Sequence, residues 1–191
     1  APVGCAASGR PAVTRPVFAD LAGQERVIDT LTAEVDRGNP THAWLVTGPP
    51  GSGRTTAARA FAAALQCTQT PAGCGECSNC KMVMNSEHPD VSFVSTDKFE
   101  YQIADVRHLI TRAQESAGTG RWRIIIIEDA DRMSERSTNV LLKAIEEPPA
   151  KMIWILSAPS PADVLVTIRS RCRAVNLSVP STQDVADLLV R

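Results

Sequence analysis

The sequence has no hydrophobic run long enough to cross a membrane. A membrane-spanning helix needs about 18 or more apolar residues in succession, whereas the longest runs that look buried are residues 124–127 and 152–156. Residues 1–16 contain three prolines and two glycines but no apolar core of the kind found in a signal peptide. We therefore predict that residues 1–16 form a flexible tail, and that the protein is cytoplasmic and makes no contact with a membrane.

The sequence also lacks an excess of charge of either sign. Its 191 residues include 20 Lys and Arg and 21 Asp and Glu, which gives a net charge of −1. Without an overall positive field, the chain has no strong electrostatic attraction to nucleic acids or anionic membranes. Any contact with DNA must then be local or shared with other chains. Because 43% of the residues are hydrophobic, the composition excludes an intrinsically disordered protein.

Five short apolar segments alternate with helical patterns along the chain. The expected strands are residues 43–47, 91–95, 124–127, 152–156 and 174–177. Apolar residues recur at helical spacing in residues 18–35, 55–65, 103–113, 140–145 and 163–168. The run 124–127 consists of β-branched residues only, which is typical of a strand buried on both faces. The sequence therefore predicts an α/β fold with a mainly parallel five-stranded sheet flanked by helices.

A glycine-rich segment, GPPGSGRT at residues 48–55, lies between an expected strand and an expected helix and has the spacing of a phosphate-binding loop. The backbone N–H groups of such a loop turn toward phosphate, and the helix N-terminus adds partial positive charge. The candidate nucleotide-binding residues are Gly48, Gly51, Ser52, Gly53, Arg54 and Thr55. Arg54 replaces the usual lysine, and because a guanidinium is broader than an ammonium, binding can survive while efficient phosphoryl transfer is not expected. A tight turn with glycines by chance is the alternative.

An acidic pair follows the expected strand at residues 124–127. Glu128 and Asp129 lie where a strand of this kind holds magnesium in nucleotide-hydrolysing enzymes. The common order is aspartate followed by glutamate, so Asp129 is one methylene too short for the residue that activates water, and errors of about an ångström can cost roughly 100-fold in rate. An acidic turn that caps the next helix is the alternative. Whether ATP and magnesium still bind stays open.

Four of the six cysteines are close together in the sequence. Cys67, Cys74, Cys77 and Cys80 have the spacing of a tetrahedral zinc site. Gly73 and Gly75 allow the chain to bend around the ion. Four thiolates leave no open coordination position, so the zinc is expected to be structural. Partly buried free thiols and disulfides are the alternatives.

The tripeptide Ser170-Arg171-Cys172 follows an expected helix and precedes the last expected strand. This position puts Arg171 at one end of the sheet, where it could face a neighbouring subunit. From the tripeptide alone, a solvated surface arginine is the alternative.

Several segments in the same order resemble the clamp-loader subunits of bacterial DNA polymerase III. They are residues 18–25 (FADLAGQE), 42–55 (HAWLVTGPPGSGRT), the four-cysteine segment, 124–131 (IIIIEDAD), 141–149 (LLKAIEEPP) and 170–172 (SRC). The resemblance implies an AAA+ ATPase fold with strand order 5-1-4-3-2. It further implies a main domain at residues 17–179 with a zinc module at 67–80, and the first helix of a small lid domain at 180–191. Arg171 would be an arginine finger that reaches ATP held by the adjacent subunit.

The departures from the family pattern favour a subunit of the delta-prime type over the ATP-hydrolysing gamma/tau type. They are Arg54, the inverted pair Glu128-Asp129, and Ala158 and Pro159 at the positions of polar sensor residues. The resemblance thus implies a subunit without ATPase activity of its own, in a hetero-pentamer with gamma/tau and delta subunits. That complex loads the sliding clamp onto primed DNA. An active gamma/tau ATPase, a P-loop phosphotransferase and a zinc-dependent nucleic-acid-binding module are the alternatives.

Overall fold

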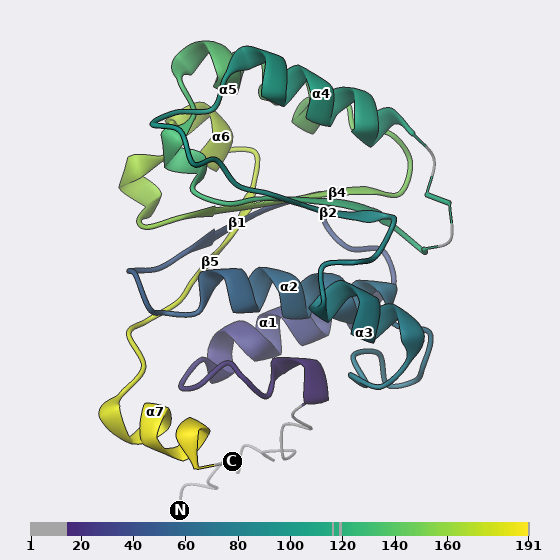
Figure 1. Ribbon diagram of the computed structural model, residues 1–191, viewed down its shortest axis with the longest axis vertical. Coiled ribbons are helices and arrows are strands. Elements are labelled where there is room, and N and C mark those ends of the chain that lie inside the picture. The colour runs from purple at the N-terminus through teal and green to yellow at the C-terminus, as the bar shows by residue number, and fades with distance from the viewer. Residues whose placement is uncertain (1–14, 116, 119, 191) are drawn as a thin grey trace, which may run out of the picture.

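The computed structural model describes residues 15–115, 117–118 and 120–190, and in these residues it contains one five-stranded parallel sheet (Figure 1). The strands are β1 (Ala43–Thr47), β2 (Val91–Val94), β3 (Arg123–Ile127), β4 (Met152–Ala158) and β5 (Arg173–Asn176). Their order in the sheet is β2-β3-β4-β1-β5, and every neighbouring pair is parallel. The predicted α/β fold and the strand order 5-1-4-3-2, counted from the other edge, are therefore confirmed.

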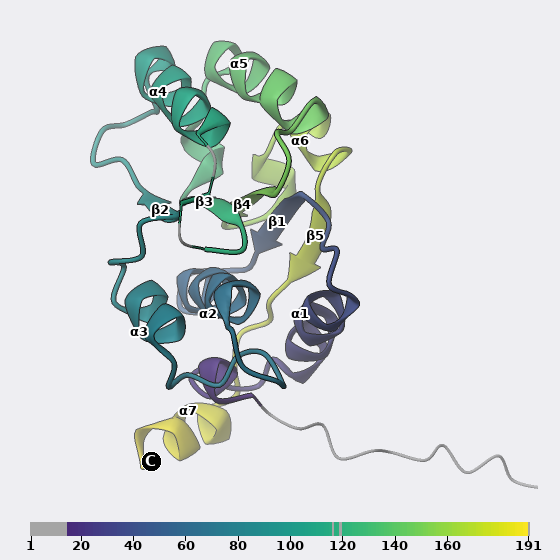
Figure 2. The same cartoon turned by 90° about the vertical axis from the view of Figure 1, so that its right-hand side faces the viewer.

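Helices cover both faces of the sheet (Figures 1 and 2). One layer consists of α1 (Glu25–Arg37), α2 (Arg54–Gln66) and α3 (Ser78–Met84). The other consists of α4 (Ile103–Gln114), α5 (Glu135–Glu146) and the short α6 (Val166–Arg169). The last helix, α7 (Thr182–Leu189), lies beyond the first layer. Three 3-10 helices complete the described elements: η1 (Pro16–Phe18), η2 (Ala130–Arg132) and η3 (Pro161–Asp163). Of the described helices, none combines the length and apolar character that crossing a membrane requires.

Alternating side chains of each central strand point into two separate cores. Trp44 of β1 and Ile126 of β3 belong to the core under α1, α2 and α3, where the ring of Trp44 meets Phe61 edge-on at 5.0 Å. Leu45 and Ile127, one residue further along the same strands, belong to the core under α4, α5 and α6. Because both faces are buried, these strands are apolar except for Thr47 at the end of β1 and Arg123 at the start of β3, as is typical of a fully covered parallel sheet.

The first helix begins later than the predicted residues 18–35. Residues 16–18 form η1, the chain then turns, and α1 runs from Glu25 to Arg37. Gly23 takes part in that turn with a φ of 67°, a left-handed conformation that favours glycine. A Cβ at Gly23 would lie 2.6 Å from a carboxylate oxygen of Asp184 on α7, so a larger residue there would require that side chain to shift. The predicted helix at 163–168 is likewise divided into η3 and α6, because the chain is extended at Val164.

The segment that leads to α7 is tied to the turn before α1. Gln24 is buried, and its side-chain amide donates to the carbonyl of Ser178 at 2.7 Å and accepts from the backbone N–H of Ser178 at 3.2 Å. The two residues are 154 positions apart in the sequence. This double contact joins the beginning and the end of the described chain.

Residues 1–14 of the predicted tail lie outside the described residues. Arg15, the next residue, is buried, and its guanidinium donates to the carbonyl of Ala72 at 2.7 Å and pairs with Asp36 at 2.5 Å. Pro16 begins η1. The last two residues of the expected tail are thus packed against the segment that carries the cysteines.

Candidate functional site

The glycine-rich loop connects β1 to α2, as the sequence predicts. Gly51 and Gly53 have φ values of 83° and 90°, and α2 begins at Arg54 directly after them. Gly48 is needed for a different reason, because a Cβ there would lie 2.4 Å from Oγ of Ser52 and 3.0 Å from the carbonyl of Leu177. Ser52 is buried, and its hydroxyl has no hydrogen-bond partner among the described residues. The loop therefore has the tight backbone that brings N–H groups close to a phosphate.

Arg54, the residue in place of the usual lysine, folds back onto this loop. Its Nη1 donates to the carbonyl of Gly48 at 2.7 Å, and its Nη2 lies 3.7 Å from Oδ1 of Asp129. Its side chain is only 17% exposed. The cation of the loop is thus held by a backbone carbonyl and a carboxylate of the protein itself.

The two residues of the acidic pair at the end of β3 make different contacts, Asp129 through its carboxylate and Glu128 through its backbone. Asp129 has a left-handed backbone with φ 50°, and its carboxylate lies between Arg54 and Arg132, whose Nη2 is 3.9 Å from Oδ2. The peptide of Glu128 is held on both sides, because its N–H donates to the carbonyl of Val94 at 2.8 Å and its carbonyl accepts from Tyr101 at 2.5 Å. Of the predicted nucleotide-site residues, the structure thus brings Gly48, Arg54 and Asp129 into direct contact.

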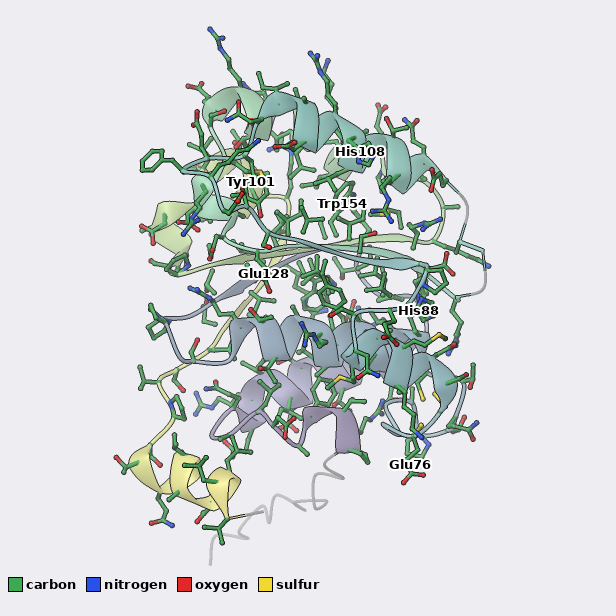
Figure 3. The ribbon with its side chains drawn as sticks, viewed as in Figure 1. Glu76, His88, Tyr101, His108, Glu128 and Trp154 are labelled. Carbon is green, nitrogen blue, oxygen red and sulfur yellow. The ribbon has the colours of Figure 1, made fainter. Side chains whose placement is uncertain are left out.

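Tyr101 is a residue of this region that the sequence analysis missed. Its hydroxyl donates to the carbonyl of Glu128 and lies 3.2 Å from the carbonyl of Val94, so it joins the ends of β2 and β3. Figure 3 shows Tyr101 and Glu128 near the same end of the sheet. Burial raises the pKa of Tyr101, and the negative charges of Asp129 and Glu128 raise it further, so the phenol stays neutral and donates. The one available signal was that Tyr101 is the only tyrosine in the sequence.

Ala158, at the end of β4, lies directly beside the loop. Its carbonyl accepts from the N–H of Gly48 at 3.3 Å, and its methyl group is fully buried. The resemblance described above places a polar sensor residue here, whereas alanine offers no side-chain hydrogen bond at this point. Thr47 at the end of β1 instead donates to the side chain of Asn176 on β5.

The four clustered cysteines converge on one point. Their sulfur atoms all lie within 4.8 Å of one another, with 3.6 Å between Cys67 and Cys74 and 3.9 Å between Cys77 and Cys67. Four sulfur ligands at about 2.3 Å from one ion in a tetrahedron are separated by about 3.8 Å. The spacing of these sulfur atoms therefore suits a tetrahedral metal ion, and the cluster could hold one.

Backbone N–H groups point at the sulfur atoms of the same cluster. The N–H groups of Glu76 and Cys77 lie 3.4 and 3.3 Å from Sγ of Cys74, and the N–H of Cys80 lies 3.4 Å from Sγ of Cys77. Burial alone would raise the pKa of Cys77, but hydrogen bonds from Cys80 and Thr68 outweigh it and lower the pKa to about 6. At Cys80, which is fully buried, burial prevails and raises the pKa. The turns at Gly73 and Gly75 have φ values of 95° and 74°, as the predicted bends require.

Arg171 lies on the surface just after α6 and contacts both residues near it in sequence and Glu146, which is 25 positions away. Its Nε donates to Oε1 of Glu146, the last residue of α5, at 2.5 Å, and its side chain is 39% exposed. Cys172 has no place in the cysteine cluster, and burial raises its pKa to about 12.

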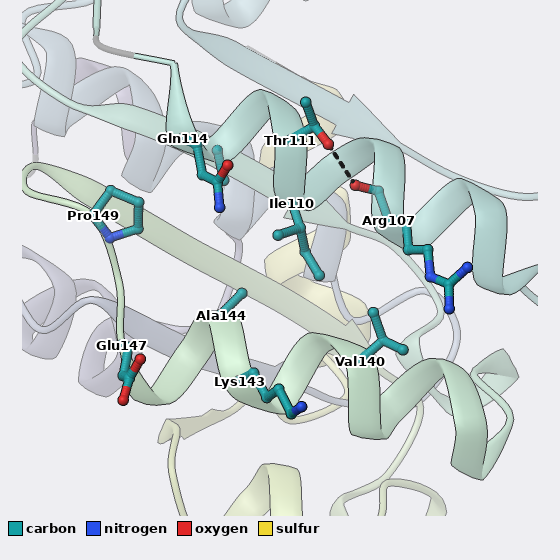
Figure 4. Close-up of a pocket in the computed structure, with 10 residues that line it drawn as sticks. Arg107, Ile110, Thr111, Gln114, Val140, Lys143, Ala144, Glu147 and Pro149 are labelled. Atoms are coloured by element: carbon teal, nitrogen blue, oxygen red, sulfur yellow. Dashed lines mark hydrogen bonds between the residues drawn. The ribbon is translucent and has the colours of Figure 1, made fainter.

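Among the cavities that lie outside this loop are a groove and a cleft next to helices. A groove of about 530 Å³ runs between α4 and α5, with Ile110, Val140 and Ala144 along it and Arg107 and Lys143 at its side (Figure 4). A smaller cleft of about 280 Å³ lies between the turn at Gly23 and α7 and includes the carboxylates of Asp184 and Asp187.

The sheet order and the loop between β1 and α2 define the class of protein, a P-loop α/β domain of the AAA+ kind. Among solved structures, a DNA polymerase III gamma subunit-related protein from Thermotoga maritima matches with a TM-score of 0.58 and 22% identity, over 80% of this chain and 46% of that one. A RuvB variant from the same organism matches with a TM-score of 0.61 and 16% identity, over 93% and 53%. These similarities support the fold.

Sequence comparison identifies the family. The family model described as "DNA polymerase III, delta subunit" matches residues 23–181, and the chain belongs to this family. DNA polymerase III subunit gamma/tau of Mycobacterium tuberculosis is 36% identical over 157 residues, which are 81% of this chain and 27% of the relative. DNA polymerase III subunit delta' of Pseudomonas aeruginosa is 31% identical over 159 residues, which are 81% of this chain and 48% of the relative. The chain thus spans about a quarter of the gamma/tau relatives and about half of the delta' relative. The resemblance found in the sequence is confirmed at the level of the family.

Proposed function

We propose that this chain is the AAA+ domain of a delta-prime-type clamp-loader subunit, which does not hydrolyse ATP itself. The observation that carries the proposal is the position of Arg54, whose guanidinium donates to the carbonyl of Gly48 and faces Asp129. A working site needs this cation on the outer phosphates and the carboxylate on magnesium or water. In this chain the two groups partly neutralise each other.

The neighbouring residues support the same proposal. Asp129 is also close to Arg132, so two cations compete with a metal ion for its carboxylate. Ala158 offers no side-chain group to orient an attacking water. Weak nucleotide binding through the loop amides is compatible with the proposal, whereas rapid turnover is not.

We assign the cysteine cluster as a structural zinc site with the ligands Cys67, Cys74, Cys77 and Cys80. Zinc is the metal that four thiolates in a tetrahedron most commonly select in a non-redox protein. The N–H groups that point at Cys74 and Cys77 favour the thiolate form that binds metal. All four positions would be filled by protein, so the ion would hold the segment between α2 and α3 in place and take no part in catalysis.

The proposed role of this subunit in ATP hydrolysis depends on Arg171. As a partly exposed arginine on the surface, it would stabilise negative charge on the phosphoryl group in the adjacent subunit's site. A finger that acts on a neighbour needs no ATP in its own domain. This explains why a chain whose Arg54 is bound to its own Gly48 and Asp129 would still keep Arg171.

The proposal implies specific partners and boundaries. The partners are gamma/tau and delta subunits in a hetero-pentamer, and the assembled complex would act on the sliding clamp and primed DNA in the cytoplasm. Residues 17–179 would form the AAA+ domain, and 180–191, which include α7, would begin the lid domain.

A second candidate is an ATP-hydrolysing gamma/tau subunit. It is favoured by the identity to the Mycobacterium tuberculosis gamma/tau subunit, 36%, against 31% to the Pseudomonas aeruginosa delta' subunit. Because the chain belongs to this family, no observation separately favours a P-loop phosphotransferase or an independent nucleic-acid-binding module.

One experiment separates the two subunit types. ADP and ATP are titrated into the purified chain with and without magnesium, and turnover is measured on the same sample. The delta-prime type predicts weak or no binding and no turnover. A turnover of order 1 s⁻¹, which is ordinary for phosphoryl-transfer enzymes, would establish the gamma/tau type.

A further inference from the structure

The guanidinium of Arg171 is held on one side and free on the other. Nε donates to Glu146 at 2.5 Å, and Nη1 donates to the carbonyl of Thr167 at 2.9 Å and to Oγ of Ser170 at 3.3 Å. Nη2 has no hydrogen-bond partner in the part of the chain that the structure describes. Two N–H groups of a planar, permanently charged fork are therefore still available.

The end of α5 positions Glu146 next to Arg171. It is the last residue of that helix, and the chain turns away at Pro148 and Pro149 immediately afterwards. The side chains of Glu146 and Arg171 are 45% and 39% exposed. An ion pair with this exposure contributes little to folding stability, so its main effect is on where the guanidinium lies.

An unrestrained arginine samples many rotamers and loses that freedom when it binds a ligand. A side chain that is already ordered loses less conformational entropy on binding. Pre-organised groups therefore stabilise a transition state better than groups that must first be ordered. The contact with Glu146 orders Arg171 through Nε, while the Nη2 edge can still donate to phosphate oxygens. Glu146 need not be released for that interaction.

We propose that Glu146 is the positioning residue of Arg171 and pre-orders its guanidinium for the phosphoryl group in the neighbouring subunit. This inference rests on the proposed role of Arg171 as an arginine finger. Glu146 acts through Arg171 alone and touches no substrate. Its substitution therefore matters only while Arg171 is present.

The test is a double-mutant cycle in the full-length subunit, reconstituted with its partner subunits. ATP turnover is measured for wild type, Glu146→Ala, Arg171→Ala and the double variant. Glu146→Ala is expected to lower kcat by a large part of the loss that Arg171→Ala causes, with KM for ATP changed by less than about twofold, the signature of an interaction made in the transition state. In the Arg171→Ala background, Glu146→Ala should cause no further loss.

Two further variants separate positioning from a structural role. Glu146→Gln keeps an oxygen that accepts from Nε, so it should retain most of the wild-type kcat. Glu147→Ala removes the adjacent carboxylate, which lines the groove between α4 and α5 and is not bonded to Arg171, and should behave as wild type. If Arg171→Ala is silent, the finger role and this inference both fail. If Arg171→Ala is impaired while Glu146→Ala is silent, or equally harmful in both backgrounds, only the positioning role of Glu146 is wrong.

Discussion

The guanidinium of Arg54 lies between the carbonyl of Gly48, 2.7 Å from Nη1, and the carboxylate of Asp129, 3.7 Å from Nη2. The cation and the acid of the candidate nucleotide site thus contact each other. In a lysine-bearing loop the compact ammonium can leave a carbonyl and enter the space between phosphates. The broader fork of Arg54 satisfies two partners at once, so its release for a phosphate requires breaking both contacts.

Arg54→Lys is expected not to create ATPase activity. Lysine repairs the phosphate contact only, whereas the short Asp129 side chain and the apolar Ala158 still leave the attacking water without orientation. Nucleotide affinity should rise while turnover stays at background, which calorimetric titration and a phosphate-release assay on the same sample can measure. Turnover restored by this one substitution would mean that the acidic pair is functional as it stands.

The cysteine cluster is expected to bind about one equivalent of zinc per chain, since structural four-cysteine sites are filled by one ion. Cys80→Ser should remove the ion and destabilise the segment between α2 and α3, because Cys80 is fully buried. Elemental analysis of reduced protein measures the first effect and limited proteolysis the second. Cys172→Ala is the matched control and should keep the zinc, since Cys172 lies outside the cluster. Less than about a tenth of an equivalent in wild type contradicts the assignment.

Tyr101→Phe is expected to lower the free energy of unfolding by about 1–3 kcal/mol, because the loss of the hydroxyl leaves the carbonyl of Glu128 without this donor. The hydroxyl also lies 3.2 Å from the carbonyl of Val94, which keeps its hydrogen bond from the N–H of Glu128. Denaturant titration followed by tryptophan fluorescence measures the change. Phe99→Ala is a control from the same connection, since that ring is 96% exposed and its loss should change stability by less than about 0.5 kcal/mol. Equal effects of both substitutions would show that the hydroxyl contributes nothing.

The protein should become less stable in acid, because the stabilising contribution of ionised Glu34 is lost there. Burial would raise its pKa, but hydrogen bonds from Thr41 and the charges of Arg173 and Arg37 outweigh burial and lower the pKa. A carboxyl with a lowered folded-state pKa stabilises the fold above its unfolded value of about 4.5, and this contribution is lost as the pH falls toward the folded value. Unfolding measured from pH 7 to 3 should therefore be less pH-dependent in Glu34→Gln than in wild type. Asp29→Asn, at an exposed position of α1, should leave the profile unchanged. Identical profiles for wild type and Glu34→Gln would contradict the prediction.

Local patterns in the sequence were sufficient for the sheet and for the two clusters of candidate residues. The isoleucine run, the glycine spacing and the cysteine spacing each lie within a few residues, so their physical meaning can be read locally. The contacts that decide the chemistry are long-range. Arg54 meets Asp129, which adopts a left-handed backbone at the end of β3, across 75 residues, and Tyr101 reaches Glu128 across 27 residues.

The late start of α1 has a similar cause. The apolar spacing of residues 18–35 fits a helix throughout, but Gly23 adopts a left-handed turn, and Asp184 of α7 lies against it. That contact involves a residue far away in the sequence. A pattern confined to neighbouring residues contains no information about it, so boundaries of this kind need the tertiary structure.

The pair of hydrogen bonds between Gln24 and Ser178 fixes the register between the turn before α1 and the segment that leads to α7. An amide that donates to the C=O and accepts from the N–H of one residue reproduces the contact of two adjacent strands at a single point. While both bonds are intact, the segment before α7 cannot shift along the turn before α1 without breaking at least one of them. The side chain of Gln24 thus ties the position of that segment to the start of α1, although the two are far apart in the sequence.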